Sequence, residues 1–491
     1  MATQPKMIPF GEWLPDLPDY ANPGAILAKN CIPRAKSYQQ LNSLASFTTA
    51  LTSAALGAIW LQDTSNIVYN FAGDAQDLYR LDSGTTWTNV SKSLHAYTST
   101  NWEFAKFGNN VLAVDYSDPM QSYVVGSSSA FADQSGSPYN AKRIAVVRDF
   151  VVLGDLQAYG PDVIGWSGYN NAAIWTPSRA TQSDRQQLFG KGGRVQRIVP
   201  GEVGTIFQEH SIWAMEYTGP PLIFQLDEVE VGRGTPAPNS VCWLGATRFY
   251  YSHDGFYEFT LPGPSQPIGN SRVDTWITQN SDDASRMLMR GAVDRRNRLV
   301  MWAFPSSSSL AYNDRVIIYN WAVNRWSYGE LNTELLMEYV SSGLSLDQLD
   351  TPFPSGIDAQ SINVDSDAYK GGSLGFAAFG TDHKTATFAG SPLTASIDTM
   401  EYDVGDGSRV YCDQVTPIVD GTPSTTITVQ VGKRNLPNGN VNFDPARAVD
   451  SIGNANVRAN SRYQRYRVNI SGGFSHAQGV RAAVSPAGGN R

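Results

Sequence analysis

The sequence predicts an all-β protein whose central part is a β-propeller. Aromatic residues make up 11% of the 491 residues, and 44 glycines and 27 prolines favour strands and turns over helices. Charged residues make up only 17%. This fraction is low for a helical protein, because the exposed faces of its helices need Glu, Lys and Arg. Apolar runs of strand length recur in groups spaced by about 40 residues, which is the repeat length of four-stranded propeller blades.

The clearest repeat element is a predicted hairpin. Val316–Tyr319 is a run of β-branched and aromatic residues typical of a buried strand. Trp321–Asn324 is short and polar enough to be the turn, and Trp326 and Tyr328 then alternate on one face of the next strand. We place this hairpin in the outer half of the sixth unit and expect Trp321 and Trp326 to pack between blades.

Similar units predict six to seven blades. The first six are expected to begin at residues 58–61, 102–107, 143–147, 195–199, 241–244 and 289–293. In the third unit we assign the fourth strand to Ala173–Trp175. A seventh unit spans about 341–389 and is interrupted by a Gly-, Ser-, Pro- and Asp-rich insertion at 344–373. The alternative fold is a sandwich or a set of stacked sheets, because short strands alone do not specify topology.

The two ends of the chain differ from the repeats and predict a second, smaller unit. Residues 1–50 are interrupted by Pro9, Pro15, Pro18, Pro23 and Pro33, so they form an extended segment that must pack on another part of the chain. Residues 51–391 form the propeller. Residues 392–491 contain period-two strands such as Thr425–Val431 and Tyr463–Ile470, typical of a small β-sandwich. We expect the N-terminal segment and this C-terminal region to form one platform.

Bulk properties limit the possible functions. The net charge of −8 argues against a protein that wraps nucleic acid. Three distant cysteines form no CxxC pair and are expected to be buried, free thiols in a reducing compartment. The sequence has no apolar run of membrane-spanning length and no apolar signal core after the N-terminus, so we expect a soluble protein outside the general export route.

Catalytic and metal motifs do not emerge from the sequence. The five histidines are scattered and form neither HxxxH nor HExxH. Gly190–Arg194 is glycine-rich and basic but lacks the spacing of a phosphate-binding loop. Asp227 and Glu228 are adjacent, so on a strand they point to opposite faces rather than forming a carboxylate pair. We therefore expect no enzyme activity, no cofactor and no metal site.

The C-terminal charge distribution is uneven. After Asp450 the chain has no Asp, Glu or Lys, yet it has six arginines. Arg465 and Arg467 share one face of a predicted strand. Two interpretations stay open: an interface with an acidic neighbouring subunit or with nucleic acid, or a solvated face. The candidate subunit-interface residues, which include two apolar anchors of the N-terminal segment, are Arg458, Arg462, Arg465, Arg467, Arg481, Trp13 and Leu17.

Both ends of the chain resemble one protein family. The N-terminal pattern is Trp13-Leu14-Pro15-Asp16-Leu17-Pro18, then Pro23-Gly24, Ala28, Asn30, Ile32-Pro33 and Tyr38. The C-terminal pattern is Arg462-Tyr463, Tyr466-Arg467-Val468, Ile470, Phe474, His476-Ala477, Gly479-Val480 and Pro486-Ala487-Gly488-Gly489. These runs resemble the tail hub or nozzle proteins of short-tailed bacteriophages, a group that includes tail accessory and packaged-DNA stabilisation proteins. Between the two ends the resemblance is architectural only.

The resemblance implies a structural protein of the virion tail that assembles in the host cytoplasm. Six copies would form a hexameric ring that extends the channel of the portal and adaptor rings, retains packaged DNA and conducts it during ejection. Expected partners are the adaptor or head-to-tail connector protein, tail fibre or spike and needle proteins, and double-stranded DNA in transit. Six chains would carry a charge of about −48, which would repel DNA phosphates if it faces the channel.

The insertions at 344–373 and 176–193 are candidate gate or tip elements, because long loops in compact folds are often functional. Two other classes stay open. The first is a carbohydrate-binding or glycoside-hydrolase propeller, and the second is an interaction scaffold unrelated to phage.

Overall fold

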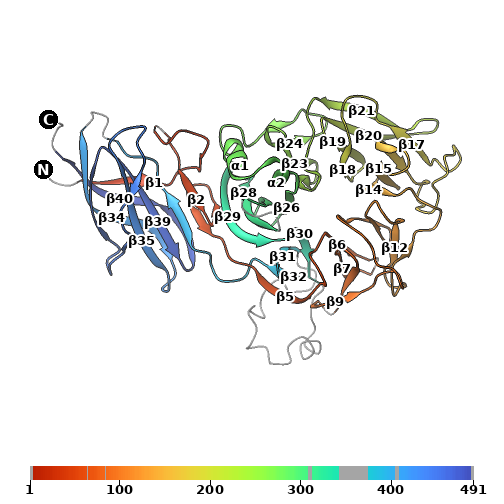
Figure 1. The fold of residues 1–491 in the computed structure, drawn as a ribbon, viewed down its shortest axis with the longest axis horizontal. Helices are drawn as coiled ribbons and strands as arrows, with labels where there is room; N and C mark the ends of the chain where they lie inside the picture. Colours follow the sequence, from red (N-terminus) through yellow and green to blue (C-terminus); the bar gives the residue numbers. More distant parts are fainter. Residues whose placement is uncertain are drawn as a thin grey trace.

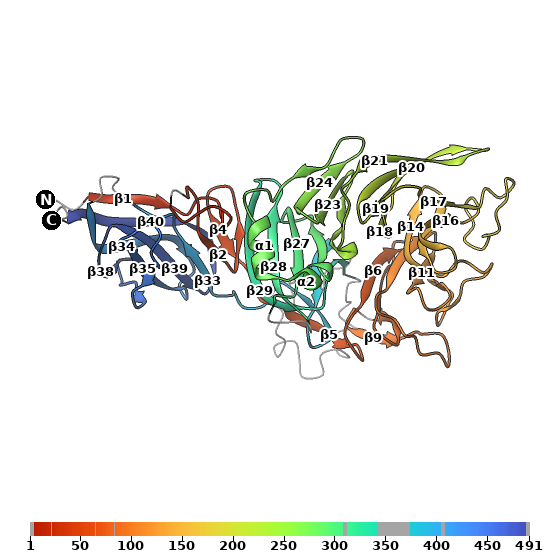
Figure 2. The ribbon, with the colours of Figure 1, turned by 45° about the horizontal axis from the view of Figure 1, so that its top comes forward.

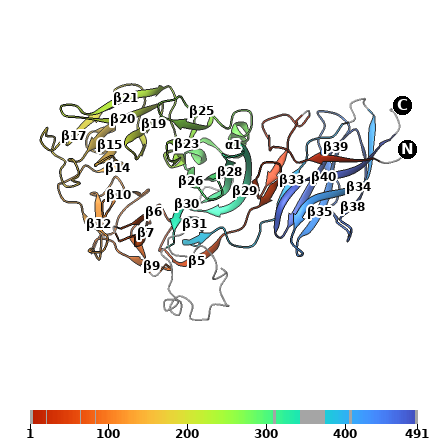
Figure 3. The same cartoon turned by 180° about the vertical axis from the view of Figure 1, so that it is seen from behind.

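The chain folds into a propeller and a β-sandwich placed end to end (Figure 1; Figure 2). This computed structural model describes the whole chain except residues 1–3, 21, 64, 83, 308–311, 342–373, 404–407 and 488–491. The view from behind shows both chain termini at the end of the sandwich away from the propeller (Figure 3), where β1 (Gln4–Pro9) pairs with β40 (Phe474–Ala487). The two ends of the chain therefore belong to one structural unit.

The propeller has seven blades of four antiparallel strands, which confirms the predicted fold class. The first three blades are β6–β9 (Gly57–Gln62, Val68–Gly73, Leu78–Asp82, Thr86–Asn89), β10–β13 (Glu103–Phe107, Asn110–Val114, Gln121–Val124, Ala132–Asp133) and β14–β17 (Ala141–Val147, Phe150–Leu156, Gly160–Trp166, Asp184–Gln187). The next three are β18–β21 (Val195–Val199, Val203–Gln208, Ser211–Gly219, Ile223–Val231), β22–β25 (Cys242–Leu244, Thr247–Ser252, Gly255–Thr260, Gln266–Pro267) and β26–β29 (Arg290–Asp294, Leu299–Phe304, Asn313–Asn320, Arg325–Thr333).

The strands in the middle of a blade are buried on both faces. Every residue of β15 and every residue of β27 is buried, because each blade packs against a neighbour on either side. Such strands read as continuous apolar runs, which is why the repeats were visible in the sequence.

The seventh blade is closed by a strand from the N-terminal part of the chain. It contains β30 (Leu335–Val340), β31 (Leu374–Phe379) and β32 (Lys384–Thr387), and its fourth strand is β5 (Ala45–Ala50). β5 pairs antiparallel with β32, and the amide of Thr49 donates to the Thr85 carbonyl of the first blade at 2.8 Å. Residues 45–50 thus belong to the propeller, whereas the sequence analysis placed them in the N-terminal segment. An isolated strand carries no sign of a partner more than 300 residues away.

A second correction concerns the third blade. Its fourth strand is Asp184–Gln187, and Ala173–Trp175 is not a strand. Trp175 is nevertheless buried, and its indole Nε1 donates to the Ala172 carbonyl at 2.7 Å. The strand prediction for Ala173–Trp175 was therefore wrong, because a buried apolar residue can also lie in a loop that faces the core. The predicted insertion 176–193 contains β17, so only the residues on either side of this strand are loops. The other predicted insertion, 344–373, lies outside the described residues.

The sandwich has two sheets. One has the order β3 (Cys31–Pro33), β4 (Tyr38–Gln40), β40, β34 (Arg409–Gly421), β38 (Ala455–Ser461), and β1 also pairs with β40. The other contains β33 (Ala395–Asp398), β39 (Tyr463–Ser471), β35 (Thr426–Arg434), β36 (Asn442–Phe443) and β37 (Arg447–Ala448). Alternate apolar residues of both sheets fill the space between them, including Val415, Val429, Ala459, Val468 and Val480. Both terminal regions contribute to this unit.

The second sandwich sheet continues into the sixth blade. The short strand β2 (Leu27–Lys29) pairs antiparallel with β33 and makes one parallel contact with β29, between Lys29 and Tyr328. Beside this contact the Trp13 ring packs between Trp276 and Tyr328, with ring centroids 5.1 and 5.3 Å away. The Asp16 carboxylate accepts from the amides of Thr275 and Trp276 in the first turn of α1 (Asp274–Asn280). Backbone pairing, apolar packing and a helix cap thus join the N-terminal segment to the propeller.

The predicted hairpin forms β28 and β29 of the sixth blade. Trp326 is fully buried, and its ring lies 5.2 Å from Phe256 of the fifth blade and 4.6 Å from Tyr319. The Trp321 ring stacks on Phe249 of the fifth blade at 6.2 Å. Both tryptophans therefore pack between blades, as predicted. A second short helix, α2 (Asp283–Met287), lies between the fifth and sixth blades in the sequence.

The three cysteines are free and buried, as predicted from their spacing. Burial raises the pKa of all three thiols, and it brings the pKa of Cys412 to about 11. In the described part of the chain no helix is long and apolar enough to cross a membrane.

Candidate functional site

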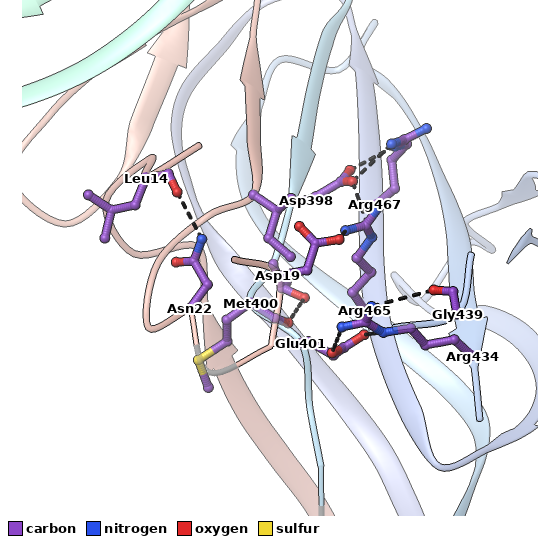
Figure 4. Close-up of polar contacts among 12 residues, drawn as sticks. Leu14, Asp19, Asn22, Asp398, Met400, Glu401, Arg434, Gly439, Arg465 and Arg467 are labelled. Atoms are coloured by element: carbon purple, nitrogen blue, oxygen red, sulfur yellow. Dashed lines mark hydrogen bonds and ion pairs between the residues drawn. The ribbon is translucent and has the colours of Figure 1, made fainter. Parts of the chain in front are cut away.

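The N-terminal segment meets the C-terminal region at a cluster of ion pairs (Figure 4). The Arg467 guanidinium makes a bidentate pair with Asp398, with distances of 2.7 Å from Nε to Oδ1 and 2.9 Å from Nη2 to Oδ2. Arg465 Nη1 donates to Asp19 Oδ2 at 2.9 Å, and Arg465 Nε lies 3.8 Å from Asp398 Oδ2. Asp398 is only 1% exposed, so one buried carboxylate holds two arginines.

Strand register explains how this cluster forms. β33 pairs with β39 so that Asp398 lies directly opposite Arg467. Two residues away on β39, Arg465 points to the same face and reaches the N-terminal segment through Asp19. The Phe443 ring covers both guanidinium groups, 3.9 Å from Arg467 and 5.2 Å from Arg465. The shared face of these two arginines was predicted, but their partners lie within the chain, an arrangement that neither sequence interpretation included.

A second buried pair lies beside the first. Arg434 donates from Nε and Nη2 to the two carboxylate oxygens of Glu401, at 2.7 and 2.6 Å. Both side chains are less than 10% exposed. Bidentate pairs of this kind fix the orientation of both partners, so this one joins the end of β35 to the segment that follows β33.

The apolar candidates are also used inside the molecule. Trp13 is 0% exposed, and its ring contacts Trp276 and Tyr328, so its side chain is not available to a neighbouring subunit. Leu17 is half-buried at the loop where its amide bonds to the Leu14 carbonyl. Trp13 therefore joins the N-terminal segment to the propeller, whereas the hydrogen bond of Leu17 lies within the segment.

The remaining candidates lie toward solvent. Arg458 on β38 and Arg481 on β40 are exposed, and neither has a hydrogen bond or ion pair within the described residues. Arg462 is half-buried, with its guanidinium 5.5 Å from the ring of Tyr463. On both strands the flanking residues Val457, Ala459, Val480 and Ala482 are buried, so Arg458 and Arg481 project from the outer face of the first sandwich sheet.

A second candidate site lies on the axis of the propeller, where the innermost strands converge. Two cavities of about 510 and 250 Å³ meet there and share the wall residues Asn239 and Arg290. Residues of all seven innermost strands (β6, β10, β14, β18, β22, β26 and β30) line them. We call the larger the mouth cavity and the smaller the inner cavity.

A buried carboxylate organises the arginines of this axis. Glu103 Oε1 accepts from Arg143 Nη1 at 2.9 Å and from Arg197 Nη1 at 2.7 Å, while its Oε2 accepts from the Ile144 amide at 3.2 Å. The Glu103 and Arg143 side chains are only 3% and 7% exposed. This bridge joins the second, third and fourth blades.

Two further ionisable groups of the mouth cavity are perturbed by burial. Burial raises the pKa of the Asp115 carboxyl, and its Oδ2 atom is buried without a hydrogen-bond partner in the described chain. Burial lowers the pKa of Lys142, whose ammonium lies 3.8 Å from Asp155 and 4.7 Å from the centre of the Tyr116 ring. Among the described residues no group of three His, Cys, Asp or Glu side chains is arranged to hold a metal ion.

The sequence analysis missed the axial site. Arg143, Arg197 and Arg290 each occupy one of the first three positions of an innermost strand. That recurrence at the start of three repeats was a usable signal, because equivalent positions of different blades meet at the axis. The residues are far apart in sequence, so no short motif contains them.

Comparisons with known proteins found similarity only at the level of structure. No family model and no curated protein matches the chain. The extracellular domain of a hybrid two-component system from B. thetaiotaomicron aligns over 81% of this chain and 45% of its own length, with 8% identity and a TM-score of 0.40. YCF48 bound to a D1 peptide aligns over 59% of this chain and 84% of its own, with 10% identity and a TM-score of 0.35. BamB from Moraxella catarrhalis aligns over 72% of this chain and 92% of its own, with 10% identity and a TM-score of 0.38. The chain thus spans less than half of the first of these proteins. The propeller assignment itself rests on six four-stranded sheets and on β26–β29, which form the remaining unit of four strands within a larger sheet.

Proposed function

We propose that the chain is a structural subunit of the tail nozzle or hub of a short-tailed bacteriophage. Six copies form a ring that extends the portal and adaptor channel, retains packaged DNA and conducts it at ejection. In this proposal the chain has no catalytic role. Its partners are other copies of itself, the adaptor and the tail fibre or spike proteins.

One observation carries the proposal: the two runs that resemble the phage family lie at opposite ends of the chain, yet they form a single unit. The Asp19 carboxylate accepts from Arg465, and the rings of Tyr20 and Tyr463 meet edge to face at 5.8 Å. Farther along, Tyr38 pairs with Ala477 of β40. If both runs belong to one platform, their residues are expected to contact each other, as they do here. Two chance similarities at opposite ends of a chain would give no reason to expect such contact.

The outer face of the first sandwich sheet supports a role in assembly. Arg458 and Arg481 are exposed there without partners in the described chain, and the same sheet exposes 36% of Tyr411 and 45% of Met7. Met7 lies opposite Arg481 in the pairing of β1 with β40. Aromatic residues, methionine and arginine are the residue types enriched at protein interfaces. Because the whole chain carries a charge of −8, a second copy offers acidic surface to these arginines.

The closed propeller supports the proposal, because a subunit of a structural ring needs a rigid body. β5 closes the ring of blades, so the propeller has no open first or last blade and no unsatisfied seam. A ring of identical subunits requires a head-to-tail interface in which two different surfaces meet. The outer face of the sandwich would provide one of these surfaces.

The ring can be tested in solution with a charge-reversal variant. The wild-type chain of 53.5 kDa, alone or with the adaptor ring of the same particle, is expected to give a six-chain species of about 320 kDa by mass photometry. The double variant R458E/R481E should shift this equilibrium toward monomer by about tenfold or more, because it places like charges at the interface. Arg298→Glu, at an exposed turn between β26 and β27 of the propeller, is the control for charge reversal outside the sandwich and should leave the equilibrium unchanged. A chain that stays monomeric under both conditions would contradict the proposal.

A further inference from the structure

The axial cavities of the propeller contain an arginine without a carboxylate partner. Arg290, the first residue of β26, forms part of the wall of both cavities. Its Nη1 donates to the Leu56 carbonyl at 3.0 Å. Among the described residues no carboxylate lies within 4.0 Å of its guanidinium group. The half-buried Arg290 side chain thus faces the cavities with a neutral carbonyl, not a carboxylate, as its hydrogen-bond partner among the described residues.

The carboxylates around Arg290 already have other partners. Glu103 accepts from Arg143 and Arg197, and Glu338 accepts from Arg295 at 2.9 Å. Glu334 accepts from the Ala55 amide at 2.9 Å and lies 2.5 Å from His383 Nδ1. The arrangement leaves the guanidinium of Arg290 as the unpaired charge at the junction of the cavities.

The electrostatic surroundings are unfavourable for this charge. Burial, and to a smaller degree repulsion from Arg197, lower the pKa of Arg290 to about 10, although the carboxylate of Glu334 acts in the opposite direction. Buried charges in proteins are normally paired, because an unpaired ion loses its hydration without compensation. An anion bound in the cavity would supply the missing partner.

We propose that the propeller axis binds a small molecule that carries an oxyanion, such as a carboxylate or a phosphate group, with Arg290 as the principal contact. The planar guanidinium group can donate two parallel hydrogen bonds to such an anion. The mouth cavity of about 510 Å³ leaves room for a polar body. The unpartnered Oδ2 of Asp115 in that cavity can accept from a hydroxyl group of this body. This site is independent of the proposed role in a virion tail.

The test measures binding of three probes to the full chain by titration calorimetry at constant ionic strength, which keeps screening equal. The probes are inorganic phosphate, D-glucuronate and neutral D-glucose. We expect at least one of the two anions to bind with a Kd of about 1 mM or below, and glucose to bind at least about tenfold more weakly. Glucuronate binding more tightly than phosphate would indicate that the hydroxylated body is recognised, and equal binding would indicate that the oxyanion alone is recognised.

Two substitutions at one position separate binding from folding. Arg290→Gln keeps an amide donor for the Leu56 carbonyl but removes the charge, and it should weaken anion binding by about tenfold or more. Arg290→Lys keeps the charge without the planar fork and should give a smaller loss, so it carries the test if the glutamine variant does not fold. Arg458→Gln on the exposed face of the sandwich is the control and should bind like wild type. The proposal would be overturned if neither anion binds the wild-type chain, if glucose binds equally well, or if the folded Arg290 variants bind the anions with unchanged affinity.

Discussion

Removal of residues 1–50 is expected to abolish the stable fold of the propeller, although these residues lie outside the repeats. The deletion removes β5, which is the fourth strand of the seventh blade, and it also removes β1 to β4 from the sandwich. It further removes Trp13 from its buried contacts with Trp276 and Tyr328. These losses exceed the margin of about 5–15 kcal/mol by which domains are stable.

A matched pair of deletions isolates the contribution of closure. Removal of residues 1–44 keeps β5 and should leave a propeller that unfolds cooperatively, whereas removal of residues 1–50 opens the ring. We expect the shorter deletion to give a cooperative urea transition and the longer deletion to give none, because the longer one also loses a paired strand and its buried side chains. Urea denaturation followed by tryptophan fluorescence measures the difference. Equal stability of the two deletions would show that β5 does not close the propeller.

Substitution of Asp398 by alanine is expected to lower the free energy of unfolding by about 3–5 kcal/mol. Asp398 is buried, and its two oxygens hold Arg467 and lie near Arg465 (Figure 4). Without this carboxylate the guanidinium of Arg467 stays against the Phe443 ring with no counter-charge. Chemical denaturation of wild type and Asp398→Ala measures the loss.

The origin of this loss can be separated from a general effect of the substitution. Asp413→Ala, at an exposed position of β34, should change stability by less than about 0.5 kcal/mol. The double variant D398A/R467L should recover part of the loss, because it no longer buries an unpaired charge. A loss in D398A no larger than that in the control would mean that the ion-pair cluster does not stabilise the joint.

The propeller was predictable because its blades depend on local patterns. Phe150–Leu153 and Leu299–Phe304 are apolar throughout, and each belongs to a strand that is followed by a turn and another strand, so the repeat can be counted directly. The hairpin around Trp326 was assigned correctly to the sixth unit for the same reason. Where an apolar residue is buried by a turn, as at Trp175, the pattern alone suggested a strand that the structure does not contain.

Long-range pairing was not predictable in the same way. The sequence carries no local sign that Ala45–Ala50 pairs with Lys384–Thr387, or that Asp398 lies opposite Arg467. The arginine-rich C-terminal region was recognised, but exposure separates its members: Arg465 and Arg467 serve the interior, while Arg458 and Arg481 face solvent. The axial arginines escaped notice because each belongs to a different blade.

Electron cryo-microscopy of the native particle tests the proposed role most directly. Our account predicts a sixfold ring of this chain at the distal end of the tail, below the adaptor, with the sandwich built from both chain ends at the contacts between subunits. Density in that ring should show a seven-bladed propeller in each subunit. Particles that lack the chain, or a chain located outside the tail, would contradict the account.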